Sequence, residues 1–259
     1  MGSVPWVEVN DARTLGGLRL VVSKGIPNPW SEGAKALFDV KRIPWTPVPQ
    51  RVMGANTELG EWTGQTSAPV AIYEDEPPRT TWSAILHLAE RLAPEPALIP
   101  RDPEERARMF GYLHELCGEM GFGWCRRLHF THATLQGGTL LQVVGEYVGG
   151  RYGYGVHPPE IIEARMLELL ALFGTALRRQ YDAGRPFFIG DRLSALDLYW
   201  SAFVALIQPL PAEVCPMYEE SRQFYSTRND VLLERIDPVL IAHRDRIYRE
   251  YLPMPLRLR

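Results

Sequence analysis

Two hydrogen-bond donors stand where the sequence predicts the start of a helix. The segment "NPWSEGAKALFDVKRIP", residues 28–44, has apolar residues at helical spacing and stops at a proline. Asn28 offers a side-chain amide and Ser31 a hydroxyl, and both can donate to an anion near a helix N-terminus. A purely structural alternative stays open, in which Ser31 caps the helix and Asn28 shapes a turn before Pro29.

The cysteines and histidines give no second reactive centre. Cys117, Cys125 and Cys215 form an odd, sparse set without a C-x-x-C pair, which argues against a disulfide framework or a zinc site. Cys117 and Cys125 are interpreted as buried rather than reactive. His129 and His132 lack the further ligands that a metal requires. The sequence therefore predicts a protein of the reducing cytoplasm without a bound metal.

Composition excludes several classes of partner. The chain has 259 residues and a net charge of -3, so it carries no strong field to attract nucleic acid or an anionic membrane. No segment approaches the roughly 18 continuous apolar residues of a membrane helix, and the first residues do not resemble a signal peptide. We expect a small-molecule ligand, with neither nucleic acid nor membrane as partner.

The first third of the chain alternates strand and helix signals. Residues 18–22, "LRLVV", predict a buried strand, and the helix at 31–41 follows it. Residues 45–50, "WTPVPQ", suit an edge strand because of their prolines. A polar stretch over 53–67 leads to a strand at 70–73 and a helix that stops at Pro94. This alternation predicts a small α/β layer.

After a proline-rich linker at residues 94–103, the strand signals disappear. Apolar residues at three-or-four spacing predict two long amphipathic helices, over 109–128 and 162–181. The glycine-rich residues 137–159 between them predict a long loop or a broken helix end. Further on, Ser194 and Asp197 form a capping box before an apolar run, with a structural role expected for Asp197. A final helical region is interrupted at Pro238.

Three segments, in this order, resemble the glutathione transferase superfamily. They are "VVSKGIPNPWSEGAKAL", "SAPVAIYED" and "GDRLSALDLYW", the last with Leu196 where the family usually has Ala. The resemblance, to a divergent bacterial-type member, implies an α+β chain. A thioredoxin-like α/β domain over 17–94 would precede an all-α helical-bundle domain over 101–251. It also implies a cytoplasmic homodimer.

By this resemblance Asn28 takes the place of the family's reactive Cys or Ser, and Ser31 that of the second Cys of glutaredoxins. A mixed-disulfide mechanism is therefore excluded at this helix, and stabilisation of a glutathione thiolate remains. Lowering a thiol pKa by roughly two units needs about 2.7 kcal/mol. A helix N-terminus supplies about 0.3–1 kcal/mol and a hydrogen bond to a charged group about 1.5–3 kcal/mol. One donor plus the helix end would suffice.

The remaining glutathione contacts are also implied by the resemblance. Ala68-Pro69 resembles the family's cis-proline dipeptide, whose first residue pairs its backbone with the cysteinyl part of glutathione. The family's acid and serine fall on Thr81 and Trp82, and a slip of one residue would bring Ser83 into use but still leave no acid. Trp82 could equally be a packing residue.

The second-substrate pocket is expected on the helical side. Trp30, Tyr112, Cys117 and Trp124 would line it with aromatic and apolar surface for a hydrophobic electrophile. The resulting hypothesis is a glutathione transferase-like detoxification enzyme with glutathione as co-substrate. The alternative is a non-catalytic module that kept the fold and lost the chemistry.

Overall fold

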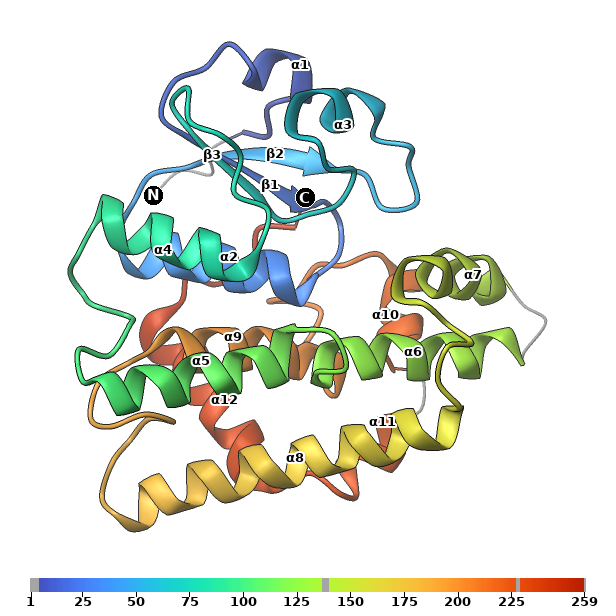
Figure 1. The fold of residues 1–259 in the computed structure, drawn as a ribbon. Helices are drawn as coiled ribbons and strands as arrows, with labels where there is room; N and C mark the ends of the chain where they lie inside the picture. The colour runs from blue at the N-terminus through green and yellow to red at the C-terminus, as the bar shows by residue number, and fades with distance from the viewer. Residues whose placement is uncertain (1–4, 137–139, 227–228, 259) are drawn as a thin grey trace.

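A three-stranded sheet forms the first part of the chain in the computed structural model, which describes residues 5–136, 140–226 and 229–258. β1 (Leu18–Ser23) is central, with β2 (Thr46–Gln50) parallel on one side and β3 (Val70–Tyr73) antiparallel on the other (Figure 1). β2 is the predicted edge strand, where prolines that cannot donate to a neighbour are tolerated.

Helices cover both faces of this sheet. α2 (Pro29–Val40) and α4 (Trp82–Leu92) lie on the face toward the rest of the molecule, and α1 (Val9–Ala12) and α3 (Thr57–Thr63) lie on the other (Figure 1). α3 falls in the stretch 53–67, for which the sequence analysis predicted no helix. The polar residues of α3 hide the helical pattern, because Leu59 and the partly buried Trp62 are the residues of this helix that pack on the small core of that face.

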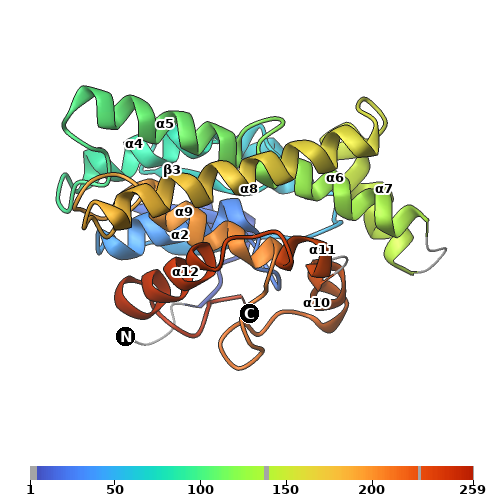
Figure 2. The same ribbon diagram turned by 90° about the horizontal axis from the view of Figure 1, so that it is seen from below.

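The second part of the chain is helical, as predicted. α9 lies at its centre against α2, and α8 runs along the outer side (Figure 2). The elements are α5 (Pro103–Cys117), α6 (Phe122–Leu135), α7 (Leu140–Tyr152), α8 (Pro159–Asp182), α9 (Ala195–Phe203), η1 (Val204–Leu206), α10 (Glu219–Ser226), α11 (Asn229–Leu233) and α12 (Pro238–Tyr251). Among the described residues, no helix combines the length and apolar character needed to cross a membrane.

The single long helix predicted over 109–128 is wrong. The chain breaks into α5 and α6 between Cys117 and Phe122, with Met120 at φ 57°. A Cβ atom added at Gly118 would lie 2.8 Å from the carbonyl oxygen of His114, so this turn requires glycine. The three-or-four spacing of apolar residues continues through the break because α5 and α6 bury their apolar side chains in the same core.

The loop predicted over 137–159 is in large part helix α7; residues 137–139 lie outside the described residues. Its glycines permit close helix packing rather than breaking the helix. An added Cβ would lie 2.3 Å from Thr134 Oγ1 at Gly145 and 3.0 Å from Thr131 Cγ2 at Gly149. Tertiary packing on α6 thus outweighs the low helix propensity of glycine.

The capping box at α9 is confirmed. The buried carboxylate of Asp197 accepts from the Ser194 backbone N–H at 2.9 Å and from the Ser194 hydroxyl at 2.6 Å. It also accepts from Phe188 N at 3.0 Å and faces His243 Nε2 at 2.9 Å. Asp197 is structural, because it ties the loop before α9 to α12.

Candidate functional site

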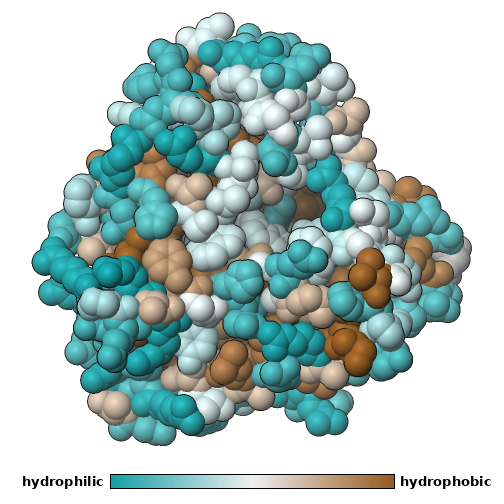
Figure 3. All heavy atoms as spheres, in the orientation of Figure 1, coloured by the Kyte–Doolittle hydropathy of each residue, from teal (hydrophilic) through white to brown (hydrophobic). Residues whose placement is uncertain are grey.

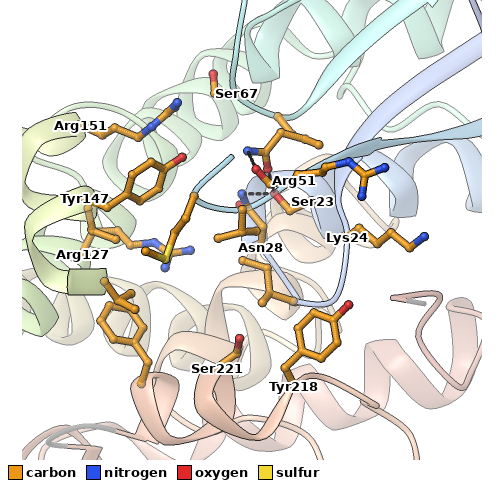
Figure 4. Close-up of a pocket in the computed structure, with 18 of the residues that line it drawn as sticks. Ser23, Lys24, Asn28, Arg51, Ser67, Arg127, Tyr147, Arg151, Tyr218 and Ser221 are labelled. Atoms are coloured by element: carbon orange, nitrogen blue, oxygen red, sulfur yellow. Dashed lines mark hydrogen bonds between the residues drawn. The ribbon is translucent and has the colours of Figure 1, made fainter. Parts of the chain in front are cut away.

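A cavity of about 440 Å³ opens between the end of the sheet and the helical part of the chain. The space-filling view is hollowed between the sheet and α7 (Figure 3). One wall consists of the loops that follow β1 and β2 and the residues before β3. The opposite wall belongs to α6, α7 and the region of α10 (Figure 4). The cavity therefore draws on both parts of the fold.

Asn28 lies at the centre of this cavity (Figure 4). It is the N-cap of α2, and its Oδ1 accepts the Trp30 backbone N–H at 3.2 Å. Its Nδ2 donates to Ser23 Oγ at 3.0 Å, and Ser23 Oγ donates to Gln50 Oε1 at 2.9 Å. Gln50 Nε2 in turn donates to the Arg51 carbonyl at 3.1 Å. In this series of hydrogen bonds each side chain donates to the next group, from Asn28 through Ser23 and Gln50 to the Arg51 carbonyl.

This chain fixes how the Asn28 amide is presented. Because Gln50 Oε1 is an acceptor, the Ser23 hydroxyl donates its hydrogen to Gln50 and accepts a hydrogen bond from Asn28 Nδ2. Asn28 Nδ2 has two hydrogens, and Ser23 Oγ is the one acceptor that it contacts in the described part of the chain. The second hydrogen is available to a ligand in the cavity, at the positive end of α2.

Ser31 occupies a different place from the one predicted. The helix begins at Pro29 with Asn28 as its cap, so the expectation that Ser31 caps it is wrong. The Ser31 side chain is fully buried, does not line the cavity, and accepts the Ser23 backbone N–H at 3.3 Å. Ser31 holds the strand end that carries Ser23, whereas Asn28 faces the cavity.

Of the residues predicted to bind glutathione, Ala68 lines the cavity, and the Ala68-Pro69 peptide bond is cis. The other three are at the start of α4 and do not line it. Thr81 caps α4 by accepting the Ala84 N–H at 3.2 Å, and its hydroxyl lies 3.2 Å from that of Ser83. The Trp82 ring packs between the two parts of the chain, against Phe110 and Tyr199.

The predicted second-substrate residues lie behind the cavity rather than in it. Cys117 is buried, and its carbonyl accepts Trp30 Nε1 at 3.0 Å. Trp30 and Trp124 both contact the ring of Tyr152, which lines the cavity, at centroid distances of 6.1 and 4.8 Å. Tyr112 packs on Phe173. Trp30 and Trp124 thus support the part of the wall that Tyr152 forms, whereas Tyr112 and Cys117 do not line the cavity.

Sequence reasoning missed that wall. Val144, Tyr147, Val148 and Tyr152 of α7 line the cavity, but the glycines of this helix suggested a loop. Arg127, on α6, also lines it, and its pattern "CRRLHF" resembles an ordinary amphipathic helix. Ser23 had one available signal, since it is the polar residue that ends a buried apolar strand.

The cavity is rich in cations. Lys24, Arg51, Arg127 and Arg151 line it, against one acid, Glu220. Such an excess of positive charge favours an anionic ligand. Burial raises the pKa of Tyr225, and also that of Tyr152, so both remain neutral phenols beside Arg127.

The cysteines are buried, as predicted for Cys117 and Cys125. Burial raises the pKa of Cys125 and of Cys215 to about 11, and it raises that of Cys117 as well. A second cavity holds His129, His132 and His157, yet within the described ranges no group of metal-ligating side chains is arranged to hold an ion.

Comparison with protein family models gives no match, and comparison with curated proteins gives none either. Solved structures are similar in fold. A glutathione transferase family member from Pseudomonas fluorescens Pf-5, with two glutathione bound, has a TM-score of 0.62 at 13% identity, covering 95% of this chain and 98% of that one. A glutathione S-transferase from Methylobacterium radiotolerans, in complex with glutathione sulfonate, has a TM-score of 0.60 at 16% identity, with 91% and 92% covered. Ure2p in complex with glutathione has a TM-score of 0.55 at 14% identity, with 88% and 99% covered.

Proposed function

We propose that this chain, which has the glutathione S-transferase fold, is a glutathione transferase-like enzyme. It binds glutathione in the cavity at the start of α2, stabilises the thiolate with Asn28, and directs it at an electrophile held by the helical wall. The observation that carries the proposal is the Asn28 amide, which lines the cavity and is oriented by Ser23 and Gln50 with one hydrogen left for a ligand.

The magnitudes support one donor at this position. A hydrogen bond to a charged group contributes about 1.5–3 kcal/mol, and a helix N-terminus about 0.3–1 kcal/mol. Together they lower a thiol pKa by roughly one to three units, since one unit corresponds to about 1.36 kcal/mol. Starting from about 8.5, such a shift makes much of the bound thiol ionised at neutral pH.

The residues around Asn28 fit the rest of glutathione. Ala68, at the cis peptide bond, lines the cavity, and its backbone would pair with the cysteinyl part of the tripeptide. Lys24 and Arg51, on the same wall, offer positive charge to its two carboxylates. Thr81 and Ser83 lie at the start of α4 outside the lining of this cavity, and the family's acid is absent there, so they are assigned no contact with the tripeptide.

Two measurements test the proposal. Isothermal titration with glutathione should show binding, and a panel of electrophiles should show conjugation above the uncatalysed rate. The absence of binding at millimolar glutathione would end the proposal. We also propose a cytoplasmic homodimer, which light scattering at assay concentration tests.

A non-catalytic binding module is the second candidate. It is favoured by Asn28 in place of Cys or Ser and by the missing acid at Thr81. The two candidates differ in one result: the module binds glutathione or another ligand and leaves the conjugation rate at the uncatalysed value, whereas the enzyme raises that rate.

A further inference from the structure

Arg127 is a buried cation in the wall of the cavity. It projects from α6 toward the space in front of Asn28 (Figure 4), and the residue is only 6% exposed. No carboxylate of the described residues lies within 4.0 Å of its guanidinium. The other arginines of the cavity differ: Arg51 pairs with Glu8 at 2.9 Å, and Arg151 is exposed.

The partners of Arg127 are neutral and leave donors over. Its Nη2 donates to the Tyr225 hydroxyl at 3.1 Å, and it also hydrogen bonds the Tyr152 hydroxyl. Tyr225 donates its own proton to the Pro27 carbonyl at 3.3 Å, so it acts toward Arg127 as an acceptor. Arg127 Nε is buried and has no hydrogen-bond partner within the described ranges. A guanidinium has five N–H donors, so two hydroxyls do not satisfy it.

An anionic ligand would stabilise a buried cation in this position. Removing an ionised group from water costs several kcal/mol unless an opposite charge and hydrogen bonds compensate it. A carboxylate matches a guanidinium in shape and accepts two parallel hydrogen bonds from it. A monoanion suits Arg127, because the two side chains that hydrogen bond its guanidinium, Tyr225 and Tyr152, are neutral phenols and add no charge of their own.

The surroundings of Arg127 define the rest of the ligand. Val144 and Val148 of α7 and Phe224 of α10 line the same wall and offer apolar surface. Tyr147, with its ring and hydroxyl, lies between Arg127 and Arg151 (Figure 4). A ligand that contacts this wall therefore needs an apolar or aromatic body that ends in an anionic group.

We infer that the second substrate is an amphipathic carboxylic acid, whose electrophilic carbon faces Asn28 while its carboxylate binds Arg127. The inference rests on the proposed function, since it assigns the helical wall to the electrophile. It narrows the hydrophobic electrophile expected from the sequence to one that also carries a carboxylate.

A chloronitrobenzoate illustrates the step. The glutathione thiolate sulfur attacks the ring carbon that bears chlorine and forms a C–S bond. The C–Cl bond then breaks, and chloride leaves with the electron pair. The thiol proton has already gone to solvent, and nothing is oxidised or reduced.

The test uses a matched pair of electrophiles, para-chloro-meta-nitrobenzoate and its neutral amide, para-chloro-meta-nitrobenzamide. The unaltered protein should favour the acid over the amide by about tenfold or more in kcat/KM, after division by the uncatalysed rates, as expected of a charge-assisted hydrogen bond. Arg127→Met should remove this preference and leave glutathione affinity unchanged. Arg127→Lys should retain part of it.

Arg151→Met is the matched comparison, because Arg151 lines the same cavity but is exposed. The Arg151→Met variant should prefer the acid over the amide by a ratio within threefold of that of the unaltered protein. Equal losses in the two arginine variants would mean that diffuse positive charge, rather than Arg127, selects the acid, and would overturn the inference. So would an Arg127→Met variant that loses glutathione binding, since Arg127 would then hold the tripeptide.

A separate measurement tests the anion site even if the proposed function is wrong. If the unaltered protein does not bind glutathione, the benzoate and the benzamide are titrated directly into it by calorimetry. Tighter binding of the benzoate by about tenfold would support the anion site in the absence of glutathione chemistry. Equal affinities would refute it. This comparison needs no variant, so it stands even if Arg127→Met does not fold.

Discussion

Asn28 Nδ2 lies 3.0 Å from Ser23 Oγ, and this contact joins the cap of α2 to the end of β1. Through it the Asn28 amide is locked with its oxygen on the helix and its nitrogen toward the cavity. A side chain that would otherwise rotate is thereby held as a donor before any ligand arrives, which spares the entropy of ordering it on binding.

Asn28→Asp removes the hydrogen-bond donor of residue 28 but keeps its role as the N-cap of α2. Aspartate is as good an N-cap as asparagine, so the Trp30 N–H keeps its acceptor, and stability should fall only by about 1 kcal/mol through loss of the hydrogen bond to Ser23. The amide donor is replaced by a negative charge beside the thiolate. We expect kcat/KM for conjugation to fall about ten- to a hundredfold, the size of a hydrogen bond to a charged group. Asn28→Ser, which keeps a cap and a hydroxyl, should lose less; an Asn28→Asp variant with full activity would exclude the proposed role.

Ser23→Ala tests the orientation of Asn28. The change removes the acceptor of Asn28 Nδ2 and the donor to Gln50 but no group that contacts a ligand in our scheme. We expect a several-fold loss in kcat, consistent with about 1 kcal/mol for a neutral hydrogen bond, and a bound thiol with a higher pKa. A change in KM for glutathione alone would instead show that Ser23 contacts the tripeptide.

The cysteines should be inert in the folded protein. With the pKa of Cys125 and Cys215 at about 11, roughly one thiol in a thousand is ionised at pH 8, and only the thiolate reacts. Iodoacetamide should therefore leave conjugation unchanged at pH 8. The labelling rate should rise about tenfold per pH unit up to pH 10, and urea should expose all three thiols. Rapid labelling with loss of activity at neutral pH would revive a cysteine mechanism.

The raised pKa of Cys125 and Cys215 also makes the stability of the protein depend on pH. A folded-state pKa raised above the unfolded value of about 8.5 contributes stability that is complete below that pH. This contribution should be lost as the pH rises from about 8.5 through 11. Denaturation by urea at a series of pH values measures the loss, and an unchanged midpoint between pH 8 and 11 would contradict it.

Tyr199→Phe should stabilise the protein. The Tyr199 ring packs against Gly33 of α2, and its hydroxyl is buried without a hydrogen-bond partner among the described residues, which costs about 1–3 kcal/mol for a buried polar group. Removing it should raise the free energy of unfolding by up to about 1 kcal/mol. Tyr225→Phe is the control, since that hydroxyl is paired with Arg127 and Pro27 and its loss should destabilise. A drop in the melting temperature of Tyr199→Phe would reveal a partner such as water.

Much of the fold could be predicted from the sequence because local signals agreed with the tertiary structure. The apolar run at β1, the prolines of the edge strand β2 and the capping box of α9 each have one physical interpretation, and each is confirmed. The resemblance of residues 21–37, 67–75 and 190–200 to the glutathione transferase superfamily implied the glutathione transferase fold, which the structural neighbours support.

The site was less predictable, because its walls depend on contacts that no local pattern encodes. Asn28 and Ala68, which the family resemblance implied as site residues, both line the cavity. Ser31 was misplaced because a helix can begin either at a serine or two residues earlier at Pro29, and both fit the capping rules. Arg127 was missed because burial without a counter-charge is visible only once the helices are packed.

The role of Asn28 is tested most directly by the pKa of the glutathione thiol bound to the unaltered protein, measured from the ultraviolet absorbance of the thiolate as the pH rises. We expect a pKa at least one unit below the roughly 8.5 of a free thiol. A bound thiol that titrates like the free one would contradict it, because Asn28 and the N-terminus of α2 would then contribute nothing to the chemistry.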